Sequence, residues 1–311
     1  RYSGRSSTRD GGGISEVGWG HDVEGNYGQA YFYEYDDNGR IREAMYGTGS
    51  FYDGCFPEFD MRHTMPHIGY DRNGNIEAMV QFGDMEVDDE PREVYMEYGV
   101  PENGNAISKV VVNGMEYDGY GYDGNGNMTF DARRGMEIGY NYMNLVSQMG
   151  DYVYIYTSTG RKLGMVTGSS STFYNGEVEY QGSEPTLLQH PQGFCKLVRN
   201  GEALENTYYY TIKDHLGSVR QVKEAVGSSE LQVVQSNDYH PFGTAFEYNS
   251  LDKNTRLFTG KEMLTGNEGE QLTEMYDFGA RLYDAVLGRW TAIDPLATKY
   301  YSWSTYSYCI N

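Results

Sequence analysis

A turn signal, Asn followed by Gly, recurs along most of this chain and constrains its fold more than any other feature. Between apolar runs the pair favours a tight β-hairpin, because both residues accept the positive φ that a type I′ turn requires. The sequence therefore predicts a series of antiparallel hairpins. The pairs are Asn38-Gly39, Asn73-Gly74, Asn103-Gly104, Asn113-Gly114, Asn125-Gly126, Asn175-Gly176 and Asn200-Gly201.

The segments between these turns alternate as β-strands do. Tyr31, Tyr33 and Tyr35 fall on one face of a strand, and residues 152–156 put tyrosines on one face with Val153 and Ile155 on the other. The chain holds 31 Tyr and 40 Gly, which combine strand formers with turn formers. A tyrosine ring covers a pleated surface while its hydroxyl stays solvated, which suits a thin wall with water on both faces. We expect an all-β fold.

The net charge is strongly negative. The 45 acidic residues outnumber the 24 basic ones and give −21 at pH 7, which repels phosphate backbones and anionic lipids. We therefore expect no nucleic-acid partner. No stretch is apolar for long enough to cross a bilayer, so we also expect no direct membrane insertion. The charge is typical of a soluble acidic surface; the alternative is an acidic wall that holds a basic cargo.

The cysteines are few and far apart. Cys55, Cys195 and Cys309 are odd in number and lack C-x-x-C spacing, so they predict neither a disulfide framework nor a zinc site. Burial of each as a small apolar side chain is the expectation. The sequence leaves their disulfide state open.

His63 and His67, with Cys55 nearby, have a spacing that suits metal ligands only on a helix. Pro57 and Pro66 argue against a helix there. We therefore expect a polar loop at this place and no metal site.

Other polar groups are interpreted as turns. The Asp- and Asn-rich segments 36–38 and 71–75 lack the glutamate that closes a calcium loop. Asp214-His215 has Ser218 nearby, but this serine lies outside any G-x-S-x-G motif. We expect no cofactor and no nucleophile at these places.

Changes in composition and in the spacing of turn signals divide the chain into three parts. Residues 1–13 are polar and glycine-rich, which predicts a flexible lead-in with order beginning after it. Hairpin signals fill residues 14–205, and a less uniform sequence runs over residues 206–311. Within that last part, residues 251–274 lack alternation and predict a loop with at most one short helix.

The hairpin units and the C-terminal third resemble the Rhs proteins. Units of the form Tyr-Asp-x-x-Gly begin at Tyr35, Tyr70 and Tyr122 and are similar to YD repeats. Residues 206–311 resemble the Rhs repeat-associated core domain in its Bacteroidetes-like form. The matching blocks are 210–220 (YTIKDHLGSVR), 239–243 (YHPFG), 259–262 (TGKE), 276–284 (YDFGARLYD), 287–290 (LGRW) and 294–297 (DPLA).

This resemblance implies an architecture and a set of partners. A β-hairpin ribbon winds into a shell-like sheet, and a β-rich core domain turns inward as a plug. The shell encloses a variable C-terminal toxin domain in cis, which would follow Asn311. The resemblance also implies a bacterial protein that is secreted or associated with the cell surface, with a secretion apparatus or a surface partner. An export signal would lie outside this sequence, since residues 1–13 carry no hydrophobic core.

The resemblance also implies an autoprotease that involves Asp294 and Arg281. In the family, the aspartate of Asp294-Pro295 pairs with one in a second Asp-Pro motif, and an upstream arginine assists. Two close carboxylates share a proton, so that one acts as acid and the other activates water. That partner would lie beyond Asn311. We therefore expect no catalysis from this chain, where Asp294 would initiate a turn and Arg281 would form a salt bridge, and autoproteolysis only in a longer protein.

The leading functional hypothesis is a shell and delivery scaffold for a toxin. The runner-up is a cell-surface adhesion or carbohydrate-binding module, and a hydrolase that acts on external substrates comes third. Aromatic residues near the C-terminus predict a packed cluster, with a sugar-binding platform as the alternative. These residues are Trp290, Tyr300, Tyr301, Trp303, Tyr306 and Tyr308.

Overall fold

The computed structural model describes residues 6–8, 13–20, 28–49, 58–83, 92–98, 104–168, 170–227, 230–246, 254–265, 272–300 and 303–308. Within these ranges the chain is nearly all antiparallel β-sheet and has no α-helix. The all-β prediction is therefore confirmed. Two short 3-10 helices occur in the same ranges, η2 (Phe258–Gly260) and η4 (Ala297–Lys299).

Strands β1 to β10 form two sheets of five strands, in which neighbours in sequence pair with each other. The first sheet contains β1 (Ser6–Thr8), β2 (Ile14–Trp19), β3 (Gly28–Tyr35), β4 (Ile41–Gly49) and β5 (Glu58–Met65). The second contains β6 (His67–Tyr70), β7 (Ile76–Gln81), β8 (Arg92–Tyr98), β9 (Ile107–Val112) and β10 (Met115–Asp118).

A 13-stranded sheet continues the same meander from β11 to β23. Its first strands are β11 (Gly121–Tyr122), β12 (Met128–Asp131), β13 (Met136–Tyr140), β14 (Val146–Met149), β15 (Tyr152–Tyr156), β16 (Lys162–Thr167) and β17 (Ser170–Asn175). It ends with β18 (Val178–Gln181), β19 (Glu184–His190), β20 (Gly193–Asn200), β21 (Ala203–Lys213), β22 (Val219–Val226) and β23 (Glu230–Ser236).

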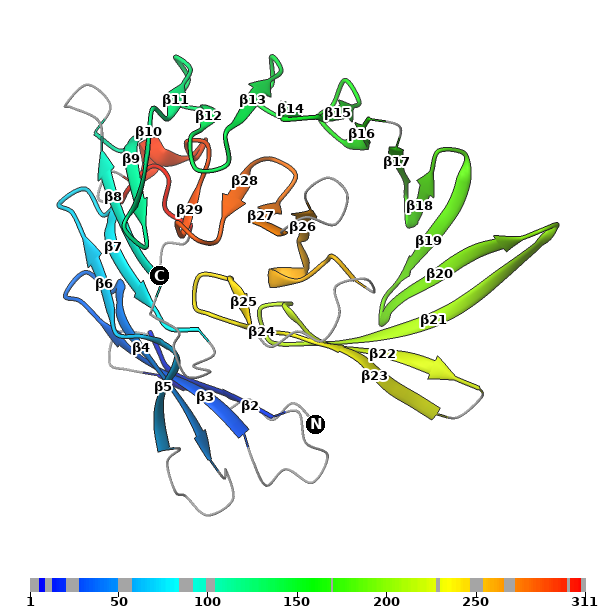
Figure 1. Cartoon of the computed structure of the whole chain (residues 1–311), viewed down its shortest axis with the longest axis horizontal. Helices are drawn as coiled ribbons and strands as arrows, with labels where there is room; N and C mark the ends of the chain where they lie inside the picture. The colour runs from blue at the N-terminus through cyan, green and yellow to red at the C-terminus, as the bar shows by residue number, and fades with distance from the viewer. Residues whose placement is uncertain are drawn as a thin grey trace.

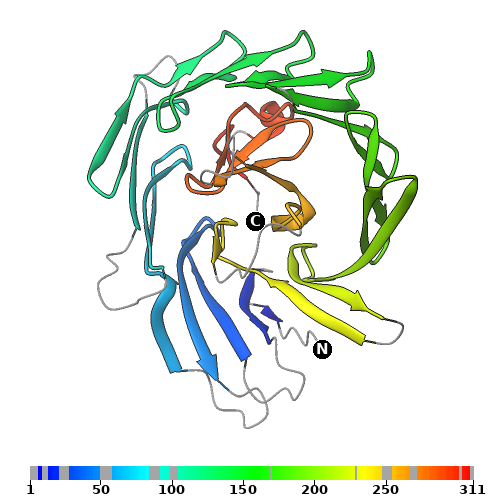
Figure 2. The ribbon, with the colours of Figure 1, turned by 45° about the vertical axis from the view of Figure 1, so that its right-hand side comes forward.

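The three sheets curve into a wall that surrounds the last part of the chain (Figure 1). The blue N-terminal strands and the yellow-green β22 and β23 approach each other at the bottom of the ring, as the turned view in Figure 2 also shows. We call β1–β23 the wall. The enclosed segment, which we call the plug, contains a pair β24 (Asp238–Tyr239) and β25 (Ala245–Phe246), and a four-stranded sheet. That sheet comprises β26 (Glu262–Thr265), β27 (Leu272–Asp277), β28 (Leu282–Asp284) and β29 (Arg289–Trp290).

The Tyr-Asp-x-x-Gly units form one kind of turn. In the first unit, Asp36 Oδ1 accepts hydrogen bonds from the backbone N–H groups of Asn38 and Arg40, both at 2.9 Å. The Gly39 N–H donates to the Asp36 carbonyl at 3.0 Å, and Gly39 alone takes a positive φ, 78°. This closes a tight turn through an aspartate and a left-handed glycine. The same contacts occur at Asp71, Asp123 and Asp214, and with Asn141 and Thr157 in place of aspartate.

The predicted type I′ geometry occurs at one of the Asn-Gly pairs within the described ranges. Asn113 and Gly114 both have positive φ, 50° and 75°. At Asn175-Gly176 and Asn200-Gly201 the asparagine ends a strand, and the glycine takes a positive φ as the first loop residue, as in a type II′ turn. The prediction of hairpins was right, but the predicted type I′ turn was wrong at most pairs. At those pairs the glycine has a positive φ and the asparagine before it does not.

Tyrosine hydroxyls connect several hairpins of the wall to the hairpin before them. Tyr70 donates to the Ile41 carbonyl at 2.8 Å, and Ile41 begins the strand that follows the preceding turn. Burial raises the pKa of Tyr98, whose hydroxyl makes the equivalent bond, to about 12, so the donor keeps its proton at neutral pH. The equivalent bonds are Tyr35 to Ile14, Tyr98 to Ile76, Tyr140 to Met128 and Tyr156 to Val146.

Three expectations about organisation need correction. Residues 6–8 lie in the expected flexible lead-in, yet they form β1 and pair with β2. Residues 251–274 contain η2 as the expected short helix, but also β26 and the start of β27, because these short strands pair with each other rather than alternate in pattern. The wall does not divide at residues 205 and 206, which lie inside β21; it continues to Ser236.

Candidate functional site

The plug has an aromatic core of its own. Phe258, Tyr276, Tyr283 and Trp290 pack together with other buried residues, and the Tyr308 ring lies 4.2 Å from that of Tyr283. Offset and edge-on contacts of this kind stabilise aromatic clusters. The predicted packed cluster is therefore confirmed for Trp290 and Tyr308, whereas the buried Tyr306 packs against Tyr122 of the wall. Tyr300 is exposed, Trp303 is half-buried, and Tyr301 lies outside the described residues.

Apolar side chains of the plug also pack on the inner face of the wall. Phe246, Val286 and Leu287 join the core of the first two sheets, beside residues such as Trp19 and Met79. On the other side, plug residues complete the core of the long sheet. These residues are Leu264, Met275 and Leu282, which pack with Met128, Ile138, Val146, Met149, Tyr152 and Tyr154. The plug therefore packs against the wall on more than one side, and Figure 1 shows its strands inside the ring.

Ion pairs connect the wall to the plug around its circumference. In most of them the wall supplies the cation and the plug the carboxylate. A buried ion pair is stable only where good geometry and further hydrogen bonds compensate both charges for the loss of water. The pairs are Arg92–Glu274 at 3.0 Å, Arg134–Asp284 at 2.6 Å, Lys162–Asp277 at 2.6 Å and Arg220–Asp238 at 2.9 Å, with Arg256–Glu179 at 2.6 Å in the reverse sense.

Asp284 is a buried carboxylate that pairs with two arginines. Arg134 contacts it at 2.6 Å and Arg133 at 3.2 Å, and Arg134 also binds Asp131 at 2.6 Å. Burial by itself would raise the pKa of Asp284, but the two guanidinium groups more than offset that effect and hold its pKa well below the usual range. Asp284 is therefore an anion that anchors the plug to the turn between β12 and β13.

Asp294 and Arg281 lie together at the surface of the plug. Arg281 Nη2 donates to Asp294 Oδ2 at 2.8 Å, and Asp294 Oδ1 accepts the Leu296 N–H at 2.7 Å. The Asp294 side chain is 36% exposed. The Arg281 guanidinium stacks on the Trp290 ring, with 4.2 Å between its Cζ and the ring centroid. The structure thus brings the two predicted site residues into contact, in the salt bridge and turn expected for this chain.

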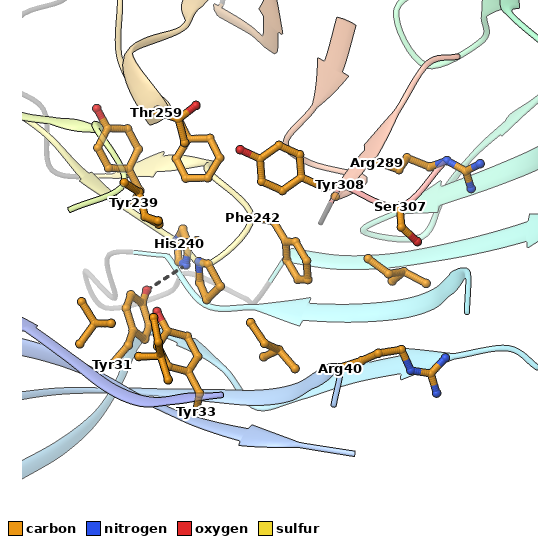
Figure 3. A pocket seen from close by; sticks show the side chains of 18 of the residues that line it. Tyr31, Tyr33, Arg40, Tyr239, His240, Phe242, Thr259, Arg289, Ser307 and Tyr308 are labelled. Carbon is orange, nitrogen blue, oxygen red and sulfur yellow. Dashed lines mark hydrogen bonds between the residues drawn. The ribbon is translucent and has the colours of Figure 1, made fainter. Parts of the chain in front are cut away.

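A cavity of about 430 Å³ separates the first sheet from the plug. Figure 3 shows Tyr31 and Tyr33 on one side and His240, Phe242 and Tyr308 on the other. Its aromatic lining explains how the wall and plug contact each other without close backbone packing. The lining includes Trp19, Tyr35, Tyr70, Tyr239, Phe258 and Tyr306.

A buried histidine joins the two sides of this cavity. Tyr31 Oη donates to the His63 carbonyl at 2.7 Å and lies 3.3 Å from His240 Nδ1 (Figure 3). Because the tyrosine proton goes to the carbonyl, His240 Nδ1–H is the donor to Tyr31. Burial, and then His63 and Arg92, lower the pKa of His240 well below its ordinary value. His240 is therefore neutral at neutral pH.

The remaining predicted residues have structural places. His63 and His67 lie on β5 and β6, so the expected polar loop was wrong; His63 is buried against Phe246, with ring centroids 3.8 Å apart. Cys195 is buried as expected, whereas Cys55 and Cys309 lie outside the described residues. The described ranges hold no group of His, Cys, Asp or Glu suited to a metal. No helix in them is long and apolar enough to cross a membrane.

Sequence reasoning missed the ion pairs of the plug. A neighbouring pair within the wall had a local signal, since Asp214 and Arg220 belong to the same block, and they bond at 3.1 Å. Arg220 then reaches Asp238 and lies 4.6 Å from the Trp19 ring centroid, which joins the wall's two ends to the plug. Nothing in the sequence indicates the pairing of Arg134 with Asp284, because 150 residues separate them.

Comparison with solved structures identifies the architecture. No family model matches the chain. The crystal structure of TcdB2-TccC3 is similar over 99% of this chain and 18% of that one, with a TM-score of 0.58 and 15% identity. The chain has an Rhs-type β-rich fold. TcdB2-TccC3 without its hypervariable C-terminal region gives a TM-score of 0.57 at 15% identity, with the same 99% and 18% coverage.

A curated relative matches a shorter region. "Salivary gland surface protein 1" of Aedes aegypti is 33% identical over 110 residues, which is 35% of this chain and 3% of that protein. The chain thus spans a small part of each protein it matches. Because the sequence identity to the solved structures is low and the chain covers a small part of them, the similarity shows an Rhs-type fold and nothing further.

Proposed function

We propose that this chain is part of a shell that encapsulates a C-terminal toxin domain in cis and serves as its delivery scaffold. The observation that carries the proposal is the wall that surrounds the plug and binds it through ion pairs on several sides. A wall of this kind separates its interior from the solvent. The likeness to TcdB2-TccC3, a protein with a hypervariable C-terminal region, supports the same function.

Protection from proteases tests the encapsulation. In the full-length gene product, the region after residue 311 should resist a protease under native conditions and be degraded once the wall is unfolded in urea. Intact mass measured over time would follow both states. Equal degradation of that region in native and unfolded protein would refute the shell.

We further propose that the full-length protein cleaves itself near the end of the plug, with Asp294 as one of two carboxylates. The salt bridge with Arg281 keeps Asp294 close to a positive charge, and its 36% exposed side chain can meet a second acid. Asp294→Asn should abolish cleavage and preserve the fold, because asparagine still accepts the Leu296 N–H. Arg281→Ala should slow cleavage. Undiminished cleavage in Asp294→Asn would refute the role of this carboxylate.

Adhesion or carbohydrate binding is the second candidate. It is favoured by exposed tyrosines on the wall, including Tyr208 and Tyr210 on β21 and Tyr142 in a turn, and by the similarity to "Salivary gland surface protein 1". In contrast, Trp290 and Tyr306 are buried and offer no surface to a sugar. Retention on a glycan array that is lost in Tyr208→Ala would favour adhesion. Secretion or surface location accords with either function.

A further inference from the structure

A lysine and two carboxylic acids meet where the wall contacts the plug. Lys162 lies on β16 of the wall, and its Nζ is 2.6 Å from Asp277 Oδ2 and 4.0 Å from Glu262 Oε2. Glu262 and Asp277 lie directly opposite each other on β26 and β27, two strands that Figure 1 shows inside the ring. The side chains are 14% exposed for Lys162, 8% for Asp277 and 21% for Glu262. The amine therefore faces two carboxyl groups in a largely buried place.

Aromatic rings help to close this place against water. Lys162 Nζ lies 4.8 Å from the ring centroid of Tyr154 and 5.2 Å from that of Tyr174. The Tyr174 hydroxyl also donates to Glu262 Oε2 at 3.2 Å. Exclusion of water makes isolated charges costly and protects reactive intermediates from hydrolysis. The site therefore suits a reaction between the amine and a carboxyl group.

The charges of the site favour a protonated Glu262. Two carboxylates directly opposite each other repel, and one lysine offsets only one of them. Arg256 pairs with Glu262 through the backbone, but its guanidinium binds Glu179 at 2.6 Å. Burial raises the pKa of Glu262, and this effect exceeds the opposing effects of Lys162 and Arg256. Glu262 therefore holds a proton more readily than an ordinary glutamate, and it can give and accept protons beside the ion pair.

We propose that Lys162 and Asp277 join in an isopeptide bond, a side-chain amide that forms within the folded chain and fixes the plug to the wall. The Lys162 ammonium gives a proton to the Asp277 carboxylate, and the neutral amine then adds to Asp277 Cγ. Glu262 takes a proton from the nitrogen and gives its own proton to Oδ2, which leaves as water when its bond to Cγ breaks. One water is released, nothing is oxidised or reduced, and Glu262 regains its starting state.

The surroundings of Asp277 support the addition step. The Gly279 N–H donates to Asp277 Oδ1 at 2.6 Å. Negative charge develops on this oxygen when the amine adds to Cγ, and a fixed N–H donor stabilises it. Oδ2, which Lys162 contacts, is the oxygen that leaves.

The cation is also the one that the reaction requires. Within the described ranges, Lys162 is the only lysine in the ion pairs that join the wall to the plug. The other pairs use arginine, whose guanidinium stays protonated and does not attack a carboxyl carbon. The isopeptide bond is therefore specific to this contact.

Tryptic digestion of the reduced full-length gene product tests the bond. Trypsin cuts after lysine and arginine, so the bond would join residues 162–196 to residues 262–281 in one species. That species would be lighter than the two peptides together by the mass of one water. Tandem mass spectrometry would locate the link at Lys162 and Asp277.

Two variants separate the amide from an ordinary ion pair. Lys162→Arg keeps the cation and cannot form the amide, so the joined species should be absent. Glu262→Gln keeps the shape of the side chain but loses the proton that it transfers. The rate at which the joined species accumulates after synthesis should therefore fall about 100-fold.

Lys109 is the matched control within the same chain. It also lies near two carboxylates, at 3.1 Å from Glu116 and 3.7 Å from Glu97, but both of these side chains are more than 60% exposed. Lys109→Arg should leave the joined species unchanged. Wild-type protein that yields residues 163–196 and 262–281 only as separate peptides would overturn the proposal. Equal accumulation in the wild type and in Glu262→Gln would overturn the mechanism through Glu262.

Discussion

The wall and the plug are stabilised in different ways. In the wall, many turns are closed by contacts within five residues, such as Asp36 Oδ1 with the Asn38 and Arg40 N–H groups, and several hairpins bond to the previous one through a tyrosine. The plug has short strands, and it is fixed by ion pairs to residues far away in sequence, such as Arg134 with Asp284. The comparison indicates that the wall can form locally, whereas the plug depends on its enclosure.

The largest expected effect is at the anchor of the plug. Asp284→Asn removes the buried carboxylate that pairs with both Arg133 and Arg134. Breaking a buried ion pair in this way costs about 3–5 kcal/mol, so the free energy of unfolding should fall by about 3 kcal/mol or more. Urea unfolding followed by circular dichroism would measure it.

An exposed pair of the wall is the control for this substitution. Arg42 and Glu34 are each 57% exposed, and Glu34→Gln should change the free energy of unfolding by less than about 1 kcal/mol. Equal losses in Asp284→Asn and Glu34→Gln would contradict the distinction between plug and wall.

The second effect concerns pH at the contact between wall and plug. His240 faces Tyr31, His63, Arg92 and Phe246, and its pKa lies below the ordinary 6.5 in the folded protein. The unfolded chain therefore binds the proton more readily, so the contribution of His240 to stability is fully present above pH 6.5 and is lost as the pH falls below it. The expected slope is about 1.4 kcal/mol per pH unit.

Urea midpoints at pH 7.5, 6.0 and 5.0 would measure this dependence. His240→Asn keeps an N–H donor in reach of Tyr31 and cannot titrate, so its midpoint should depend less on pH than that of the wild type. His67→Asn is the control, because His67 is an exposed residue of β6. This variant should show the same dependence of the urea midpoint on pH as the wild type. Identical slopes in wild type and His240→Asn would exclude His240 as the source.

A smaller effect is expected from the bonds between hairpins. Tyr70→Phe removes the bond to the Ile41 carbonyl but keeps the ring that lies against Arg40. The free energy of unfolding should fall by about 1 kcal/mol. Tyr142→Phe, at a side chain 83% exposed, should change nothing measurable. A loss above 3 kcal/mol in Tyr70→Phe would mean that the wall depends on single long-range contacts as the plug does.

The smallest effects are expected within the turns. Asn113 has a positive φ and also accepts the Glu93 N–H, so Asn113→Ala should cost about 1 kcal/mol. Asn38 lies in a turn where glycine alone has positive φ, so Asn38→Ala should stay within ~0.5 kcal/mol. Chemical denaturation of both variants would compare them, and equal costs would contradict the two turn types.

The sequence by itself determined the hairpins, the tyrosine-covered strands and the all-β class. The reason is range: Asp36, Asn38 and Gly39 lie within one turn, and their chemistry acts over a few residues. It also indicated, by resemblance, that Arg281 belongs with Asp294, which lies 13 residues away and forms the observed salt bridge.

Only the tertiary structure decided what the plug contacts. The strands at His63 and at residues 262–265 form because other strands pair with them, against the local pattern that predicted loops. The partners of Asp284 and His240 come from segments that meet when the wall curves round. Such contacts join residues that are far apart in the sequence, so patterns that extend over a few residues cannot predict them.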